Sequence, residues 1–253
     1  MSNYFDVVAY SASAIKAGKV SMLAMADFIE NGKEPTGGMN KGTLFHEALL
    51  EPEKLEKRIV TGLAKNTIAY KAIVAEAAFG TVKPDEKADL VRTVAAVWNH
   101  PEVKRLGLFK GGESEKEIYW KENGLDCKCK IDYCHADYSI EYKSTGKLGN
   151  FIRTAENMFY YLQLGWYWRG DCVASGREKP LYIVAQEQKS PFDVAVFEIP
   201  KLLLNTWYLE CLEIVRKYES GDRSGAFPSI MTFERPAYVL GADPIFENGE
   251  VEF

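Results

Sequence analysis

The sequence predicts an α/β protein, because it contains both helix signals and strand signals. Residues 1–110 are mainly helical in pattern, whereas residues 111–220 contain alternating strand segments with helices between them. Residues 221–253 contain Gly, Pro and acidic residues without sustained periodicity, so we expect a lightly structured C-terminal arm there. With 253 residues the chain is long enough to bury a large core, and we expect one domain.

The helical region begins at Ser11, which together with Ser13 gives a capping signal, and its first helix ends at Asn31-Gly32. A Gly-rich link leads to a second helix, which is closed by Pro52. Acidic residues in the first turn favour a helix that begins near Pro84. The predicted helices span residues 11–30, 41–50, 67–78 and 84–99.

The strand-rich region is predicted to begin with a meander of three strands. Residues 115–121 alternate between polar and apolar side chains, and Asn123-Gly124 is a strong turn signal. This turn leads into a hairpin formed by residues 129–143. The remaining predicted elements are a helix at residues 151–168, strands at 181–187 and 193–199, and a helix at 201–219.

The predicted hairpin brings two carboxylates together. If its loop is Ala136-Asp137, Asp132 lies directly opposite Glu141, with Cβ atoms roughly 4.5–5.5 Å apart. A three-residue loop would instead place the two acidic residues on a diagonal. Lys143 shares their face of the sheet. The opposite face is expected to point into a core and carries Ile131, Tyr133, Ile140 and Tyr142.

Two ionised carboxylates this close repel each other, so the pair needs a raised pKa or a bound cation. Hard oxygen ligands beside a lysine suit Mg²⁺ or Mn²⁺ acting on a phosphate ester. The metal would polarise the phosphate and activate water, while the Lys143 ammonium would position that water or balance charge. The alternative is that acidic residues and lysine alternate here because this is the solvated face of a sheet.

The predicted helices carry further candidate polar residues. His46 shares a helical face with Gly42 and Leu49-Leu50, where a histidine is either a core residue or a ligand. Gln163 and Tyr167 are four positions apart and therefore lie on one helical face. They either satisfy buried polar groups or belong to a site.

Composition limits the compartment and the kinds of partner. No apolar run of roughly 18 residues exists, and Met1 to Asp6 begin no signal peptide, so we expect a cytoplasmic protein without membrane association. Five cysteines, an odd number, then indicate reduced thiols. The net charge of −5 argues against binding nucleic acid by bulk electrostatics, so a DNA substrate would need a local positive groove.

The motifs follow one order along the chain, namely Gly42-x-x-x-His46, Glu115, Asp132, Glu141-Tyr142-Lys143 and Gln163-x-x-x-Tyr167. This order resembles the RecB-type branch of the PD-(D/E)XK nuclease superfamily, and within it the RecE-like exonucleases of phages and prophages. The phrases Gly42 to Pro52 and Gly124 to Asp132 carry the closer likeness. Such sequences often have an Arg before the catalytic Asp, where this chain has Lys130 and Ile131.

The resemblance implies a restriction-endonuclease-like core, in which a mixed central β-sheet is flanked by helices. The N-terminal helical region would form one wall of the site. Asp132 and Glu141 would bind catalytic Mg²⁺ together with the main-chain carbonyl of Tyr142. His46 would bind or orient a second ion, and Mn²⁺ would substitute for Mg²⁺.

The resemblance also implies roles for the remaining motif residues. Lys143 would position the attacking water and favour its deprotonated form. Gln163 and Tyr167 would bind DNA phosphate or hold the catalytic groups in place. Glu115 is a weaker candidate, which would act through a neighbouring ligand.

The implied activity is the stepwise 5′-to-3′ removal of mononucleotides from linear double-stranded DNA, which leaves a 3′ single-stranded tail for recombination by strand annealing. The implied partners are DNA ends, a single-strand annealing protein, and further copies of the chain in a ring-shaped trimer or tetramer inside a bacterial host cell. A ring would reconcile the acidic net charge with DNA processing, because basic residues need only line its channel.

Three alternatives stay open. A structure-selective or sequence-selective endonuclease would use the same metals and need no free DNA end. A non-catalytic DNA-binding or assembly module would keep the fold, although the complete set of Asp132, Glu141 and Lys143 argues against it. An enzyme acting on a small phosphate ester would need a closed pocket, and the sequence shows no Gly-rich phosphate-binding loop.

Overall fold

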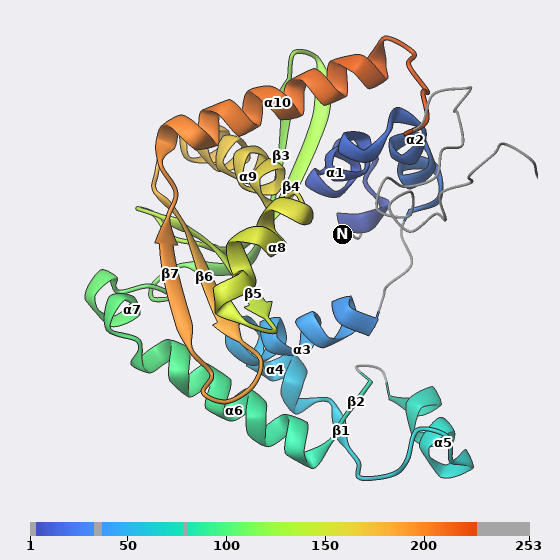
Figure 1. Ribbon diagram of the computed structural model, residues 1–253, viewed down its shortest axis with the longest axis vertical. Helices are drawn as coiled ribbons and strands as arrows, with labels where there is room; N and C mark the ends of the chain where they lie inside the picture. The colour runs from blue at the N-terminus through green and yellow to red at the C-terminus, as the bar shows by residue number, and fades with distance from the viewer. Residues whose placement is uncertain (1–3, 33–36, 78–79, 227–253) are drawn as a thin grey trace, which may run out of the picture.

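The computed structural model describes residues 4–32, 37–77 and 80–226, and within them a five-stranded sheet forms the centre of the molecule (Figure 1). The two outer pairs of strands are antiparallel, as are β4 and β5, whereas β5 and β6 run parallel. The predicted mixed sheet is therefore confirmed. In spatial order the strands are β3 (Glu113–Glu122), β4 (Leu125–Cys134), β5 (Ser139–Thr145), β6 (Leu181–Glu187) and β7 (Val194–Glu198).

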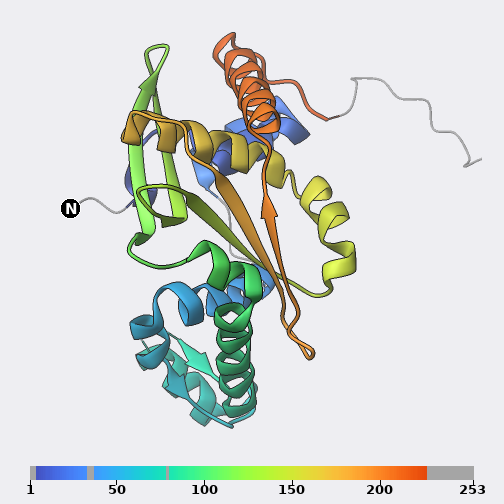
Figure 2. The same ribbon diagram turned by 90° about the vertical axis from the view of Figure 1, so that its left-hand side faces the viewer.

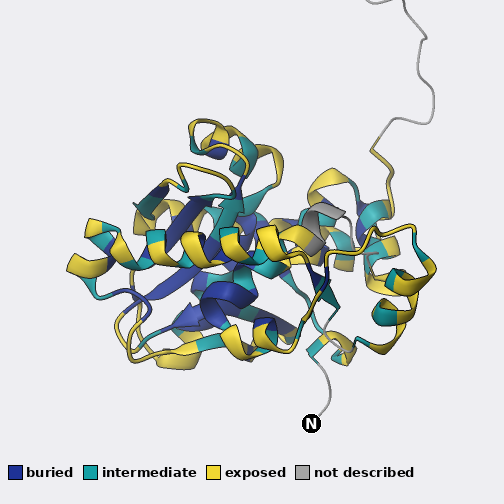
Figure 3. Cartoon of the chain, turned by 90° about the horizontal axis from the view of Figure 1, so that it is seen from below, coloured by how far each residue is buried: buried dark blue, intermediate teal, exposed yellow. Residues whose placement is uncertain are grey.

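Helices cover both faces of this sheet, as expected (Figures 1 and 2). One face packs against α9 (Tyr160–Ser175) and α10 (Lys201–Glu219), with α1 (Ala12–Val20) and α2 (Met22–Asn31) joining the same apolar cluster. The other face packs against α3 (Gly37–Leu50) and α6 (Pro84–Asn99). Figure 3 shows buried residues in the strands and exposed residues along the outer sides of the helices.

The shorter elements connect these layers. The strands β1 and β2 form a separate parallel pair beside α5, at the lower right of Figure 1. The helix α8 precedes α9 directly. These elements are η1 (Tyr4–Asp6), α4 (Pro52–Glu56), β1 (Ile59–Val60), α5 (Ile68–Glu76), β2 (Thr81–Val82), α7 (Pro101–Leu106), η2 (Leu148–Asn150) and α8 (Phe151–Asn157).

Two predicted helices are each divided in the structure. The helix expected at residues 11–30 breaks at Ser21, whose backbone is extended and whose hydroxyl accepts from the Ala24 N–H as the N-cap of α2. The helix expected at 151–168 breaks at Phe159, which has a positive φ of 52°. It then continues past Gly170, where the absence of a Cβ lets α9 approach the sheet closely.

The register of the β4–β5 hairpin matches the prediction with an Ala136-Asp137 loop. Tyr133 pairs with Ile140, and Cys134 pairs with Ser139. The prediction that Ile131 shares a face with Tyr133 is wrong, because the two side chains belong to apolar clusters on opposite sides of the sheet.

The exchange of faces coincides with an irregularity on the neighbouring strand. Glu115 and Asp132 do not pair in the β3–β4 ladder, although the residues on either side of them do. Glu115 has a positive φ of 54°. A positive φ interrupts the pleat that would otherwise put alternate residues on one face.

Other expectations have simple outcomes. The helices predicted at 84–99 and 201–219 have the expected bounds. All five cysteines are free, as expected. No helix in the described ranges is long and apolar enough to cross a membrane. Most of the predicted C-terminal arm, from residue 227 onward, lies outside the described residues, and the single-domain organisation stays a prediction.

Candidate active site

The predicted site residues come together where β4 and β5 separate beyond their short ladder. Asp132 lies on β4, and Glu141 to Lys143 lie on β5. The helix α3 brings His46 to the same place, and α9 brings Gln163. Residues that are far apart in the sequence therefore meet at one edge of the central strands.

The Asp132 carboxylate is fixed by the backbone of the facing strand. Its Oδ2 accepts a hydrogen bond from the Tyr142 N–H at 2.7 Å. The same oxygen lies 3.7 Å from His46 Nε2. Asp132 is buried, so this backbone donor helps to satisfy a carboxylate that water reaches poorly.

His46 lies between two carboxylates and a carbonyl. Its Nε2 donates to the Tyr142 carbonyl oxygen at 3.0 Å, and its Nδ1 lies 3.7 Å from Glu115 Oε1. Burial lowers the pKa of this imidazole, but the nearby Asp132, Glu115 and Glu141 carboxylates outweigh burial and raise it. The surrounding carboxylates therefore stabilise the cationic form of His46 relative to an imidazole in water.

Glu115 belongs to the same cluster, although the sequence marked it only as a weaker candidate. Its carboxylate forms an ion pair with Lys130 Nζ at 2.5 Å. Burial raises its pKa, but the nearby His46 imidazole and Lys130 ammonium dominate and lower the pKa to about 2. Donor atoms of His46, Glu115 and Asp132 lie within 4.8 Å of one another, close enough to share one metal ion.

Glu141 is the most deeply buried carboxylate of the site. Its Oε1 accepts from Gln163 Nε2 at 2.6 Å and pairs closely with Lys143 Nζ. Its Oε2 is buried without a hydrogen-bond partner among the described residues. Burial, followed by the Asp132 charge, raises the pKa of Glu141 to about 7.

This donor set fits a divalent cation. An unpaired buried carboxylate oxygen is costly, and a cation bound to it would remove that cost. Carboxylates and a main-chain carbonyl are the ligands that Mg²⁺ and Mn²⁺ prefer, and imidazole is acceptable to Mn²⁺. His46, Glu115 and Asp132 could therefore hold one ion together, and the roles of Glu141 and the Tyr142 carbonyl as ligands stay predictions.

Lys143 supplies positive charge to the site. Its Nζ pairs with Glu141 and lies 5.1 Å from the centre of the Tyr160 ring. Burial lowers the pKa of Lys143, but the Glu141 and Asp132 carboxylates outweigh burial and raise it. An ammonium that keeps its proton at neutral pH can donate hydrogen bonds and balance charge, but it cannot accept a proton from water.

The two motif residues of α9 have different positions. Gln163 reaches the site and bridges Glu141 to Lys16 of α1, whose Nζ lies 3.3 Å from Gln163 Oε1. Tyr167 is half-buried against the apolar cluster shared with α1, and burial raises the pKa of its hydroxyl, with Glu141 the next cause. Sequence reasoning missed Lys16, because a single lysine on a helix gives no signal of its own.

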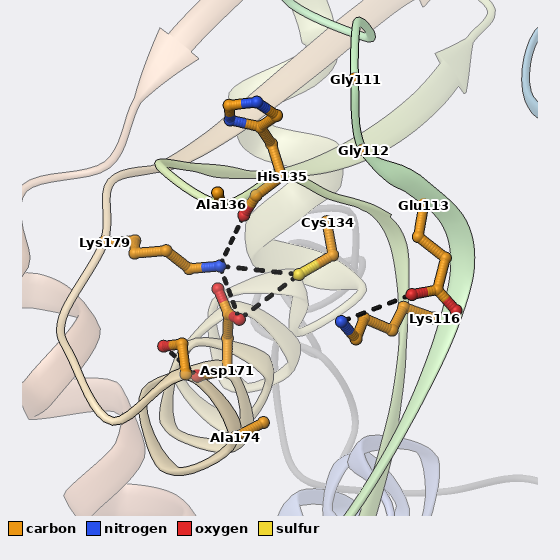
Figure 4. Close-up of a pocket in the computed structure, with 11 residues that line it drawn as sticks. Gly111, Gly112, Glu113, Lys116, Cys134, His135, Ala136, Asp171, Ala174 and Lys179 are labelled. Carbon is orange, nitrogen blue, oxygen red and sulfur yellow. Dashed lines mark hydrogen bonds and ion pairs between the residues drawn. The ribbon is translucent and has the colours of Figure 1, made fainter.

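A second polar pocket lies at the tip of the β4–β5 hairpin (Figure 4). The Asp171 carboxylate accepts from the Ser139 hydroxyl and pairs with Lys179 Nζ at 2.9 Å. Lys179 also donates to the His135 carbonyl oxygen at 2.8 Å. These buried groups satisfy one another, so we assign them to holding the hairpin tip against α9.

Comparison with known proteins agrees with this geometry. A family model described as "PDDEXK-like domain of unknown function (DUF3799)" matches residues 11–228. A crystal structure described as "Putative exonuclease" from Eubacterium rectale is similar, with a TM-score of 0.58 and 11% sequence identity. The likeness covers 93% of this chain and 92% of that chain, and at this identity it shows the fold alone.

No curated protein matches the chain. The predicted PD-(D/E)XK superfamily is confirmed, whereas the closer RecE-like assignment stays a prediction. Because the family model spans most of the sequence, the chain belongs to the family of PDDEXK-like domains of unknown function, DUF3799.

Proposed function

We propose that the protein is a Mg²⁺-dependent 5′-to-3′ exonuclease that degrades linear double-stranded DNA to 5′ mononucleotides and a 3′ single-stranded tail. The observation that carries the proposal is the buried Glu141 carboxylate, whose Oε2 has no hydrogen-bond partner among the described residues and whose Oε1 pairs with Lys143. The nuclease-like fold and the family membership support a nuclease. The direction of cleavage is supported by the RecE-like motifs of the sequence.

Two groups of ligands would hold the metal. Asp132, Glu141 and the Tyr142 carbonyl would bind one ion, and His46 with Glu115 would bind or orient a second ion. Bound Mg²⁺, or Mn²⁺ in its place, would stabilise charge on the phosphate and lower the pKa of bound water. The fold of the chain would place these ligands beside one another.

The chain's own residues would prepare the site for hydrolysis. The Tyr142 N–H holds Asp132, and the Gln163 amide holds Glu141 Oε1, so each carboxylate keeps an oxygen directed away from its protein donor. The Lys143 ammonium would donate a hydrogen bond to the attacking water or to the phosphate. Tyr167 would support Gln163 from the next turn of α9.

The proposal includes an assembly. We expect a ring-shaped trimer or tetramer that encloses the duplex and passes the 3′ tail to a single-strand annealing protein in the bacterial cytoplasm. A ring would reconcile the net charge of −5 with DNA processing, because positive potential would be needed only inside the channel. Light scattering of the purified protein tests this part, and a monomer at working concentration would contradict it.

The test of the activity uses one linear duplex labelled separately at its 5′ and 3′ ends, and one covalently closed circle. Each is incubated with Mg²⁺ or with EDTA. Early release of the 5′ label in Mg²⁺ alone, with the circle intact, is expected. Cutting of the circle would indicate an endonuclease on the same fold, and no cleavage would favour a DNA-binding module. A Glu141→Gln preparation, purified in the same way, excludes a contaminating nuclease.

A further inference from the structure

Lys16 reaches the candidate active site from α1, a helix that none of the site motifs marks. Its Nζ lies 3.3 Å from Gln163 Oε1, across 147 positions of the sequence. The Gln163 Nε2 in turn lies 2.6 Å from Glu141 Oε1. We propose that Lys16 is a positioning residue, which fixes the side-chain amide of Gln163 so that its N–H holds Glu141. The proposal rests on the proposed nuclease activity of the same site.

The chemistry of the three groups allows only one orientation of the amide. A glutamine side chain has an accepting oxygen and a donating NH₂ group, whereas an ammonium only donates and a carboxylate only accepts. Lys16 therefore selects the oxygen of Gln163, and Glu141 selects the nitrogen. A flipped amide would place a donor against Lys16 and an acceptor against Glu141, so both contacts would become repulsive.

This orientation determines which oxygen of Glu141 stays available. Oε1 has Gln163 and Lys143 as donors, which leaves Oε2 as the unpaired oxygen. If the amide of Gln163 could turn, Glu141 would lose one of the donors that hold it. Lys16 thus acts on the metal-binding carboxylate through Gln163, without touching it.

Tyr160 gives Lys16 a second anchor in the site. The Lys16 Nζ lies 5.6 Å from the centre of the Tyr160 ring, and Lys143 Nζ lies 5.1 Å from the centre of the same ring. An aromatic face attracts cations, so this ring holds both ammonium groups beside α9. The contact explains how a long lysine side chain keeps one position at the end of Gln163.

The experiment compares Lys16→Met and Lys16→Arg with a matched control on the same helix. Lys19→Met is that control, because Lys19 is one turn further along α1 and pairs with Glu210 at the surface. The first readout is the ¹⁵N–¹H signal of the Gln163 side-chain amide, assigned by its loss in Gln163→Leu. The second is kcat and KM for cleavage of linear duplex DNA, measured in the wild type and in the Gln163→Leu background.

We expect Lys16→Met to shift the Gln163 amide signal and to lower kcat about tenfold with little change in KM, as for loss of one hydrogen bond to a charged group. Lys16→Arg should restore most of the activity, and Lys19→Met should behave as wild type. In the Gln163→Leu background Lys16→Met should cost nothing further, because its effect passes through Gln163.

Two outcomes would overturn the positioning role. An unmoved Gln163 amide signal in folded Lys16→Met protein would show that Lys16 does not fix the amide. An additive loss in the double variant, together with a raised and salt-dependent KM, would make Lys16 a direct DNA contact. Failure of the wild type to cleave DNA would contradict the proposed function, while the amide signal would still decide whether Lys16 orients Gln163.

Discussion

His46 of α3 donates a hydrogen bond to the main-chain carbonyl oxygen of Tyr142 on β5 at 3.0 Å. The N-terminal helical region is thereby tied to the strand that carries Glu141 and Lys143. A metal ion that used the Tyr142 carbonyl as a ligand would compete with this hydrogen bond. Metal binding would therefore be coupled to the position of His46, and the imidazole would have to release its proton to become a ligand itself.

The first prediction concerns that imidazole. His46→Ala should weaken Mn²⁺ binding by about 10–100-fold. The change removes an imidazole that would bind or orient the metal together with Asp132 and Glu115. Isothermal titration calorimetry measures the affinity. His135→Gln is the matched control, since His135 stacks on Tyr138 at the hairpin tip. Equal affinity in the His46 variant and the wild type would remove His46 from the metal site.

The second prediction concerns the buried ammonium. Lys143→Met should keep the fold and bind Mn²⁺ like the wild type, yet lose about 10²–10⁴-fold in cleavage rate, as expected for a group that positions the reacting water. Single-turnover cleavage of a labelled duplex measures this loss. Lys121→Met provides a control, because Lys121 pairs with Asp126 at the surface of the β3–β4 hairpin. Turnover at the wild-type rate by Lys143→Met would refute the proposed role.

Much of the fold was accessible from the sequence because local rules determine it. The alternation on either side of Ala136-Asp137 predicted the register that the structure shows for Tyr133 and Ile140. The helices with clear ends, at 84–99 and 201–219, also matched. The restriction-endonuclease-like core was implied by the resemblance that the ordered motifs carry.

The differences arise where tertiary contacts outweigh local signals. The helix predicted to end at residue 168 continues through Gly170 in α9, where an added Cβ would meet side chains of the sheet. Ile131 lies on the opposite face of β4 from Tyr133, beside the point where Glu115 of β3 has a positive φ, and no residue type in the sequence predicts this irregularity. Lys16 joins the site only through the packing of α1 against α9, which the sequence pattern does not specify.

The third prediction tests that reading of Gly170. A Cβ at this position would lie 2.8 Å from Cys129 Sγ and 2.9 Å from Trp120 Cζ3. Gly170→Ala should therefore destabilise the protein by about 1–3 kcal/mol through overpacking, despite the higher helix propensity of alanine. Chemical denaturation measures the free energy of unfolding. Gly62→Ala, where an added Cβ meets nothing within 4 Å, should change it by less than about 0.5 kcal/mol.

The fourth prediction uses the raised pKa of Glu141. Burial and the Asp132 charge move this pKa from its ordinary 4.5 to about 7 in the folded protein. Between these values the folded state keeps a proton that the unfolded chain has released. The free energy of unfolding of the metal-free protein should therefore fall as pH rises from about 4.5 through about 7, by about 1–3 kcal/mol from this group.

The measurement compares thermal unfolding of metal-free wild type and Glu141→Gln at pH 5.5 and pH 8.5. The glutamine variant has no carboxylate to ionise, so its melting temperature should exceed that of the wild type by a larger margin at the higher pH. Addition of Mg²⁺ at pH 8.5 should then raise the wild-type melting temperature more than that of the variant, because the cation offsets the charge on the unpaired Oε2. Parallel pH dependence in the two proteins, with equal stabilisation by Mg²⁺, would show that Glu141 neither titrates near neutrality nor binds the ion.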